Sequence, residues 1–291
     1  MHRFLQAVGF GELNSSTTWR RIADVLIKNP DWRLSQTAED GTIVSFCAGE
    51  VAPGIGVMFC GEEDDMGEYH LSYYYPYFRG DSMIGPEETV INRRMDTEAF
   101  TGMCDDMRIG VSLIFYLQNP WEYRDVANIL ENESFVTNVQ MSGLSLSGKI
   151  LLGAQKREDE EEIRLQETKR RDSLIAEAKK GNPEAIDSLT MEDIDTITQI
   201  HLRAMDEDLY SIIDTTFIPF GSESDNYSVI GIIEGFELVK NRYTDQNIWK
   251  LQLLCNGLTF DVCIREKDLL GEPAIGRRFK GNIWMQGTVL F

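Results

Sequence analysis

Hydrophobic and polar residues alternate with a period of two through much of the first half of the chain, which is typical of half-buried β-strands. Four apolar runs of this kind occupy residues 41–49, 54–61, 69–78 and 108–119, and residues 89–94 are a shorter fifth candidate. Glycines, prolines and acidic clusters separate the runs as turns. The pattern predicts a mainly antiparallel sheet, without giving its strand order.

Helical spacing interrupts this alternation at two places. Residues 14–28 repeat apolar side chains on one helical face, after a serine or threonine that can cap the start and before an Asn-Pro pair that ends the pattern. Residues 120–130 begin with a proline, which favours the first position of a helix. Residues 135–153 then return to alternation and predict a long strand or a hairpin. Residues 1–153 are thus predicted to form an α+β domain with helices beside the sheet.

The composition changes at residue 154, where charged helix formers replace large apolar residues. Residues 155–181 contain two Glu–Arg pairs at i, i+4 spacing with the acid first, the orientation that stabilises a helix better. A glycine and a proline then separate this stretch from further helical sequence in residues 183–213. Residues 154–213 are predicted to be a polar helical connector, and a solvated helix face explains the charges better than a recognition tail does.

The last part of the chain returns to short strands. Three strands, one polar helical turn and one or two further strands follow each other in residues 227–291, and an Asn-Gly pair at 256–257 predicts a tight hairpin. This order is that of a five-stranded OB-type barrel, and an SH3-like or split barrel would give a similar pattern. Residues 214–291 are therefore predicted to form a small OB-like β-barrel domain.

The final strand, residues 276–291, carries the basic and aromatic residues of this domain. Alternation places Phe279, Ile283 and Met285 inside the barrel and their neighbours outside, although the outward Asp261 on a nearby strand weakens a cationic face. Basic residues beside an aromatic ring are what OB barrels use against single-stranded nucleic acid. The candidates for such contact are Arg277, Arg278, Lys280 and Trp284. Barrel closure, with Trp284 covering a domain interface, is the favoured alternative.

A second candidate surface is the row formed by Tyr73, Tyr75 and Tyr77, which share one face of a predicted strand. An exposed tyrosine row is suited to binding a partner protein. Half-buried sheets also use tyrosines, and Pro76 indicates a strand end or edge, so packing in the core and its rim is favoured. The row remains the best candidate interaction surface of the first domain.

The charge of the chain limits its partners. The formal net charge is −20, with −11 on residues 1–150, −7 on residues 151–210 and −2 on residues 211–291. Such an acidic surface repels a phosphate backbone, which proteins bind through lysine and arginine. Double-stranded nucleic acid is therefore not an expected partner, and single-stranded nucleic acid is a candidate only for the last segment.

No apolar run reaches membrane-spanning length and the first residues lack an export signal, so we expect a cytoplasmic protein without a membrane partner. The five cysteines are odd in number and show no C-x-x-C spacing. This count argues against a disulfide framework or a zinc site and predicts buried, reduced thiols.

Two acidic stretches are the candidates for metal or catalytic chemistry. Residues 61–70 gather carboxylates near His70 that could hold Ca²⁺ or Mg²⁺, but the spacing is not that of an EF-hand, which favours a solvated turn. Asp105 and Asp106 could be paired acids, although a charged turn is the commoner role. The chain has no P-loop, nucleophile elbow, zinc-protease or dinucleotide-binding motif. No catalytic residue, metal or cofactor is therefore assigned.

Three separated stretches carry a family resemblance: "MHRFLQAVGF", "GNPEAIDSLTMEDIDT" with the following "EDLYSIIDTTFIPFGSESDNYSVIG", and "DLLGEPAIGRRFKGNIWMQGTVLF". They resemble an uncharacterised bacterial family, found mainly in Gram-positive anaerobes, with a domain of unknown function over nearly the whole chain. The resemblance implies a bacterial cytosolic protein of this length. It implies no activity and transfers no site residue.

These observations favour a non-catalytic cytosolic protein that binds another protein or acts as a scaffold. The first alternative is single-stranded nucleic-acid binding through the C-terminal barrel. The second is an enzyme whose carboxylates gather only in the folded chain, which a linear pattern does not reveal. The sequence identifies neither the partner nor the oligomeric state.

Overall fold

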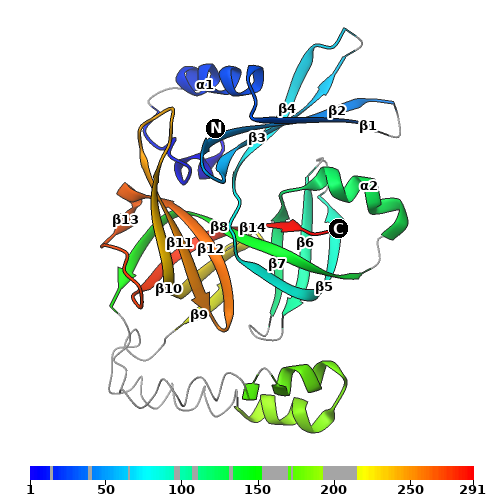
Figure 1. Cartoon of the computed structure of the whole chain (residues 1–291), viewed down its shortest axis with the longest axis vertical. Helices are drawn as coiled ribbons and strands as arrows, with labels where there is room; N and C mark the ends of the chain where they lie inside the picture. Colours follow the sequence, from blue (N-terminus) through cyan, green and yellow to red (C-terminus); the bar gives the residue numbers. More distant parts are fainter. Residues whose placement is uncertain are drawn as a thin grey trace.

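The computed structural model describes residues 1–13, 16–38, 41–64, 66–94, 99–106, 111–130, 134–152, 170–171, 173–192 and 215–291. Within these residues the chain forms two β-sheets with helices on their faces and at their ends (Figure 1). The molecule is a sheet-rich α+β protein, as the alternating pattern predicts. No helix in these ranges is both long and apolar enough to cross a membrane.

The first sheet is antiparallel and contains four strands in sequence order. Its strands are β1 (Trp32–Thr37), β2 (Ile43–Ala52), β3 (Ile55–Glu63) and β4 (Tyr69–Phe78). Helix α1 (Ser16–Lys28) lies on this sheet at Gly49, where an added Cβ would come 2.8 Å from Leu26 Cβ. The short 3₁₀ helix η1 (Arg3–Gln6) precedes α1. The predicted helix and three predicted strands are confirmed here, whereas β1 is an addition.

The second sheet contains ten strands. They are β5 (Met83–Arg93), β6 (Phe100–Asp106), β7 (Val111–Leu117), β8 (Phe135–Leu151), β9 (Thr216–Pro219), β10 (Asn226–Lys240), β11 (Asn247–Cys255), β12 (Leu258–Arg265), β13 (Leu269–Leu270) and β14 (Arg278–Val289). Helix α2 (Pro120–Leu130) follows β7, and the 3₁₀ turn η2 (Glu266–Asp268) lies between β12 and β13. Both helical elements stand where the sequence predicts them.

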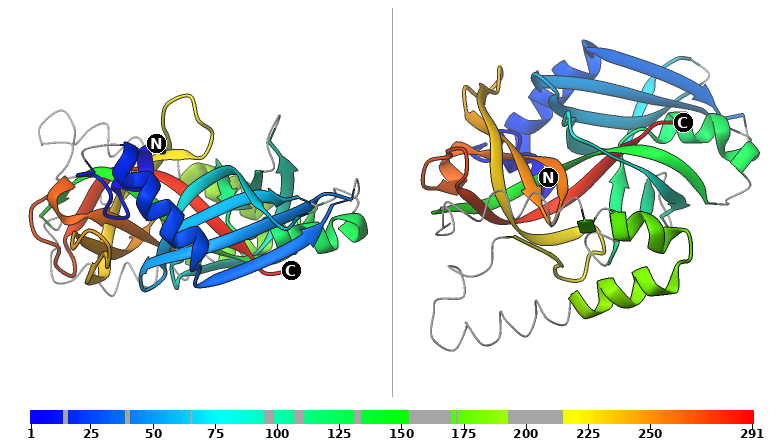
Figure 2. Two further views of the ribbon diagram at one scale, coloured as in Figure 1. Left: turned by 90° about the horizontal axis from the view of Figure 1, so that it is seen from above. Right: turned by 60° about the horizontal axis from the view of Figure 1, so that its bottom comes forward.

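Hydrogen-bonded neighbours in the second sheet close into two strand rings that share β8 and β14. The first strand ring runs β10–β11–β12–β8–β14 and returns to β10. The second runs β5–β6–β7–β14–β8 and returns to β5. Figure 2 shows β8 and β14, in green and red, crossing the middle of the molecule. The shared pair is therefore the central element of the fold.

This pairing crosses the predicted boundary between residues 1–153 and residues 214–291. The C-terminal strands have the predicted order, but β8 from the first half is needed to complete their ring. The pairs β12–β8 and β14–β7 are also parallel, and such pairs join segments that are distant in sequence. The strands of the two predicted domains thus belong to one sheet.

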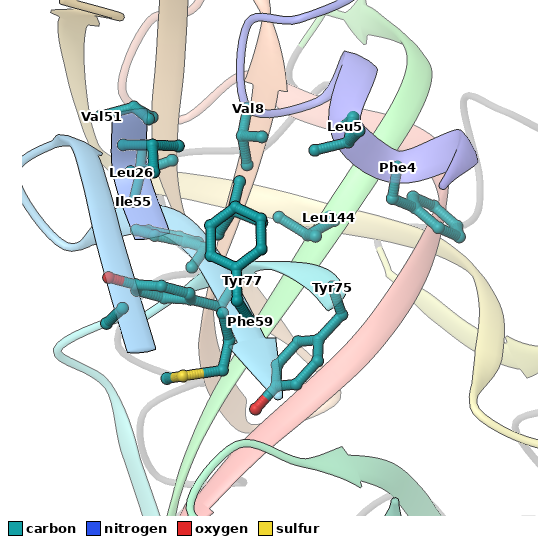
Figure 3. Close-up of a cluster of buried hydrophobic side chains, with 14 of the residues drawn as sticks. Phe4, Leu5, Val8, Leu26, Val51, Ile55, Phe59, Tyr75, Tyr77 and Leu144 are labelled. Carbon is teal, nitrogen blue, oxygen red and sulfur yellow. The ribbon is translucent and has the colours of Figure 1, made fainter. Parts of the chain in front are cut away.

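Two large clusters of apolar side chains fill the interior. Figure 3 shows the first, in which side chains of η1, α1 and the four-stranded sheet meet Leu144 of β8. The second lies within the strand rings and includes Phe115, where Cβ atoms added to Gly102 and Gly287 would come within 2.2 and 2.5 Å of its ring. Burying each large apolar side chain contributes about 1.5–3 kcal/mol. The close fit around Phe115 explains why both neighbouring strands carry glycine there.

Two members of the tyrosine row, Tyr75 and Tyr77, lie inside the molecule, and Tyr73 is half-buried. Tyr75 and Tyr77 are 2% and 5% exposed, and the Tyr73 ring is stacked 6.4 Å from that of Tyr75. The Tyr75 ring is 4.7 Å from Tyr116, and its hydroxyl donates to the Gln118 carbonyl at 3.2 Å. The favoured packing role therefore agrees with the structure. Tyr75 and Tyr77 are thus closed to a protein partner, and of the row only the half-buried Tyr73 has exposed surface.

All five cysteines are buried free thiols, as predicted. Burial raises the pKa of both Cys60 and Cys255 to about 12, so these thiols stay protonated and unreactive at neutral pH.

Part of the predicted polar connector is described and is helical, at residues 170–171, 173–179 and 183–192. Its small apolar cluster consists of Ile175, Ala178, Ala185 and Leu189. Lys179 joins it to the second sheet through an ion pair of 2.6 Å with the largely buried Glu87. Each of the two Glu–Arg pairs predicted in residues 155–181 includes at least one residue outside the described ranges.

Candidate functional site

The shared pair β8–β14 contains an irregularity of its register. The pairing reaches Gly281–Gly148 and resumes at Ile283–Ser145, so Asn282 has no register partner on β8, although it pairs with Ser228 of β10. The Ser145 hydroxyl donates to the Asn282 carbonyl at 2.9 Å and holds the strand at this point. Bulges of this kind redirect side chains and occur next to binding sites.

A groove with two lobes lies over this irregularity, and we call it the bulge groove. The first lobe, about 280 Å³, lies between η1 and the loop that precedes β10. The second lobe, about 350 Å³, lies along β8, β14 and the start of β10. Ser147 and Asn282 line both lobes, so the two adjoin. Sites for small molecules commonly have about this size.

Asn226, the first residue of β10, lines the first lobe and is only 8% exposed. Its backbone N–H donates to the Glu223 carbonyl, and its own carbonyl accepts from Phe220. Its side-chain oxygen has no hydrogen-bond partner among the described residues. Leaving such a buried acceptor unsatisfied costs about 1–3 kcal/mol. The oxygen is enclosed by protein atoms and has practically no accessible surface.

The groove is cationic although the chain is strongly acidic. Arg3 lines the first lobe, and Lys149 and Lys280 line the second. The two lysines are register partners on β8 and β14. This pairing places two positively charged side chains beside the second lobe. Among the described residues that line either lobe, only Glu223 is acidic.

A buried carboxylate holds one wall of the first lobe. Asp225 is 2% exposed and accepts a hydrogen bond of 2.9 Å from Trp284 Nε1. It also forms an ion pair with Arg94, and its carbonyl accepts from Met285 at 2.8 Å. These bonds fasten the loop before β10 to β14. Asp225 therefore positions Asn226 without reaching the groove itself.

Comparison with known proteins identifies a family for nearly the whole chain. The family model described as "Domain of unknown function, E. rectale Gene description (DUF3881)" matches residues 5–287. The chain belongs to this family. The predicted membership of a family with a full-length domain of unknown function is thereby confirmed. No curated protein and no solved structure matches this DUF3881 chain.

The groove contains only part of the nucleic-acid surface that the sequence predicts for this DUF3881 member. Trp284 is 6% exposed, stacks 5.1 Å from Phe4 and packs edge-on against Tyr116. It therefore covers an internal interface, as the favoured alternative holds, and its ring is not open to a base. The reason is that both faces of β14 are covered from Ile283 to Gly287.

The predicted basic residues separate in the fold. Arg278 is 4% exposed, and its Nε donates to the Leu152 carbonyl at 3.0 Å. Arg277 donates to the Glu272 carbonyl at 2.8 Å, away from the groove lining. Only Lys280 lines the groove. Asp261, expected to point outward, is 7% exposed and caps the N–H groups of the loop before β5.

Residues 64 and 66–68 form an exposed turn between β3 and β4, whereas Asp105 and Asp106 end strand β6, so the charged turn expected for this pair was wrong. Asp64, Glu68 and His70 bring potential ligand atoms within 4.8 Å of one another. One Asp64 oxygen accepts two backbone N–H bonds of 2.9 Å, and the other pairs with His70 at 3.0 Å. These bonds close the turn and lower the pKa of Asp64, chiefly through the bond from His70. Asp105 accepts a bond from Ser112, and the Asp106 side chain lies outside the described residues.

Linear patterns did not reveal the main groove residues, which are Arg3, Lys149, Asn226 and Asn282. They come from four elements or loops that are distant in sequence. One local signal was present, because an isolated glycine inside a strand, such as Gly281, often marks a bulge.

His2 lies behind the first lobe, with its ring 5.1 Å from that of Trp284. Burial, followed by the charge of Arg3, lowers its pKa to about 4. Its Nδ1 is buried and has no hydrogen-bond partner among the described residues. His2 is therefore neutral at pH 7, and a proton on it would disturb the aromatic contact beside the groove.

We expect acid to weaken this contact. The pKa of His2 falls from 6.5 to about 4 on folding. The stabilisation that neutral His2 gives the folded state is therefore complete above pH 6.5 and is lost as the pH falls toward 4. The free energy of unfolding, measured with urea at pH 7 and pH 4, should fall by about 2–3 kcal/mol less in His2→Gln than in the wild type. The control is exposed His70, whose pKa is raised by the bond to Asp64, so His70→Gln should not reduce the acid loss. Equal losses in His2→Gln and the wild type would contradict the assignment.

Proposed function

We propose that this protein is a non-catalytic binding protein that holds a small anionic molecule in the bulge groove. The observation that carries the proposal is the basic lining of this groove in a strongly acidic chain, with Arg3 at the first lobe and Lys149 and Lys280 at the second. The facing lysines in the adjoining lobe supply the charge preference. A cytoplasmic location accords with the five buried free thiols.

The groove favours a small molecule over the two macromolecular partners proposed from the sequence. A protein partner would need a surface other than the tyrosine row, because Tyr75 and Tyr77 are interior. Single-stranded nucleic acid would lose the stacking ring of Trp284. A concave site with a few convergent polar groups is typical of small-ligand binding.

We also propose that the first strand ring is similar to an OB fold. The order of strands and of the helical turn η2 from β10 to β14 supports it, with β8 supplying the fifth strand of the ring. OB folds bind polar ligands across one face of the strands.

Calorimetric titration of the full chain with pyrophosphate at low salt tests the proposal. We expect saturable binding that weakens as salt is added, because charge attraction drives it. Replacing both Lys149 and Lys280 by methionine keeps their aliphatic stems and should weaken binding about tenfold or more. The matched control is Lys240→Met, since Lys240 is an exposed lysine of β10 outside the groove. No binding at low salt, or equal binding by the double variant, would refute the proposal.

A further inference from the structure

The first lobe of the bulge groove presents charges of both signs, and we propose that it binds a free α-amino acid with a large apolar side chain. Arg3 takes the carboxylate and Glu223 takes the ammonium group. The inference goes beyond the proposed function, because it concerns the first lobe alone and needs neither Lys149 nor Lys280. The two charged walls and the apolar lining between them carry it.

Arg3 is the first residue of η1 and lines the lobe from that side. Its guanidinium lies over the Phe4 ring, with 4.8 Å from the Cζ atom to the ring centroid. This contact uses one flat face of the guanidinium and leaves the N–H groups at its edge for another partner. Within the part of the chain that the structure describes, Arg3 forms no ion pair. A carboxylate matches the guanidinium fork through two parallel hydrogen bonds.

Glu223 lines the lobe from the opposite side, in the loop that precedes β10. Its carbonyl accepts from the Asn226 N–H at 3.2 Å, and the Met285 N–H fastens the loop to β14 by donating to the Asp225 carbonyl. Glu223 is exposed and forms no ion pair with Arg3 or with any other described residue. The lobe therefore keeps both charges, and a carboxylate binds an ammonium group through charge-assisted hydrogen bonds.

Apolar side chains also line the lobe. Phe220 is 49% exposed and Leu146 is half-buried, so both have surface that a ligand can cover. Phe4 and Ile283 belong to the same lining and are buried. An apolar ligand side chain would remove part of the Phe220 and Leu146 surface from water, which favours binding. An amino acid without such a side chain, such as glycine, would leave this surface uncovered.

Buried groups behind the lobe hold its shape. Phe4 stacks on Trp284, with 5.1 Å between ring centroids, and Trp284 Nε1 donates to the buried Asp225 carboxylate at 2.9 Å. Asp225 belongs to the loop that carries Glu223, so these contacts fix the two walls relative to each other. A site that is fixed before binding loses less conformational freedom when the ligand enters. The lobe, about 280 Å³, is at the small end of the range for ligand sites, which suits a single amino acid better than a peptide.

Calorimetric titration of the unmodified full chain with L-phenylalanine tests this inference. Three analogues each lack one of the recognised groups: 3-phenylpropanoate lacks the ammonium group, 2-phenylethylamine lacks the carboxylate and glycine lacks the apolar side chain. We expect saturable binding of L-phenylalanine, at least about tenfold tighter than that of each analogue. No binding of L-phenylalanine, or an analogue that binds as tightly, would overturn the inference.

Two variants assign the charged walls. Arg3→Met and Glu223→Gln should each weaken L-phenylalanine binding about tenfold, because each removes one charge-assisted partner of the ligand. Glu223→Gln should leave pyrophosphate binding undiminished, which separates a lost contact from a misfolded loop. The matched controls are Arg20→Met and Glu272→Gln, which change exposed residues outside both lobes and should bind L-phenylalanine as the wild type does.

Titration with pyrophosphate distinguishes failure of this inference from failure of the proposed function. Binding of pyrophosphate without L-phenylalanine would overturn the amino-acid site while the proposed anion site stands. Binding of L-phenylalanine without pyrophosphate would overturn the anion site alone. Wild-type affinity for L-phenylalanine in either Arg3→Met or Glu223→Gln would show that the zwitterion is not held by this pair and would overturn the inference.

Discussion

Replacing Asp225 by alanine should lower the free energy of unfolding by about 3 kcal/mol or more, as measured by urea denaturation at pH 7. The carboxylate is 2% exposed, accepts a bond of 2.9 Å from Trp284 Nε1 and pairs with Arg94. Its removal leaves the buried indole N–H without an acceptor and the guanidinium without its anion. Arg94 is 31% exposed, so water can solvate part of its charge, which keeps the effect at the lower end of the range for buried pairs.

The control for this substitution is Asp24→Ala. Asp24 is an exposed aspartate of α1, and surface substitutions of this kind usually change the free energy of unfolding by no more than about 0.5 kcal/mol. Asp225→Asn should fall between the two alanine variants, because the amide oxygen can still accept from Trp284. If Asp225→Ala stayed within about 1 kcal/mol of the wild type, the loop before β10 would have to be held by other contacts.

Local elements of the fold were predictable because nearby residues determine them. The Asn-Gly pair is an example, since Asn256 and Gly257 have φ angles of 52° and 78° and join β11 to β12. Positive φ at both positions is what a two-residue hairpin turn requires. The proline at the start of α2 and the single turn of η2 follow from similar local chemistry. These signals need no knowledge of the rest of the chain.

Strand partners were not predictable, because alternation shows which residues share a face and not what covers that face. Trp284 and Gln286 were expected outside a barrel, yet both faces of β14 are covered around them and both side chains are buried. β14 is shared by two strand rings and also packs against η1 through Phe4. A strand with one solvent-exposed face and a strand such as β14 therefore show the same period-two pattern in the sequence.

Strands β1 and β6 escaped prediction for related reasons. β1 reads WRLSQT, which is largely polar because it is an edge strand with alternate residues exposed. β6 reads FTGMCDD, and its glycine and acidic residues resemble a turn. The groove was missed because its lining comes from η1, β8, the loop before β10 and β14, which only the folded sheet brings together.

The second large effect is expected at Gln286, whose replacement by methionine should lower the free energy of unfolding by about 3–5 kcal/mol. Gln286 is fully buried and links β14 to β4. Its Oε1 accepts from the Phe78 N–H at 3.2 Å, and its Nε2 donates to the Pro76 carbonyl at 2.9 Å. Methionine keeps the volume and removes both polar atoms, so two buried backbone groups lose this partner.

The size of the Gln286 effect depends on what the neighbouring Gln118 can replace. Gln118 Nε2 donates to Gln286 Oε1 at 2.8 Å, and it keeps bonds to the Phe78 carbonyl and to Ser142 Oγ when residue 286 becomes methionine. It therefore remains oriented by these groups and supplies no acceptor for the Phe78 N–H. The control is Gln252→Met, because Gln252 is partly exposed and makes a single longer bond of 3.2 Å to Ser82, so it should cost about 1 kcal/mol or less. Equal urea midpoints for the two methionine variants would show that the four-stranded sheet is held to β14 by its apolar contacts alone.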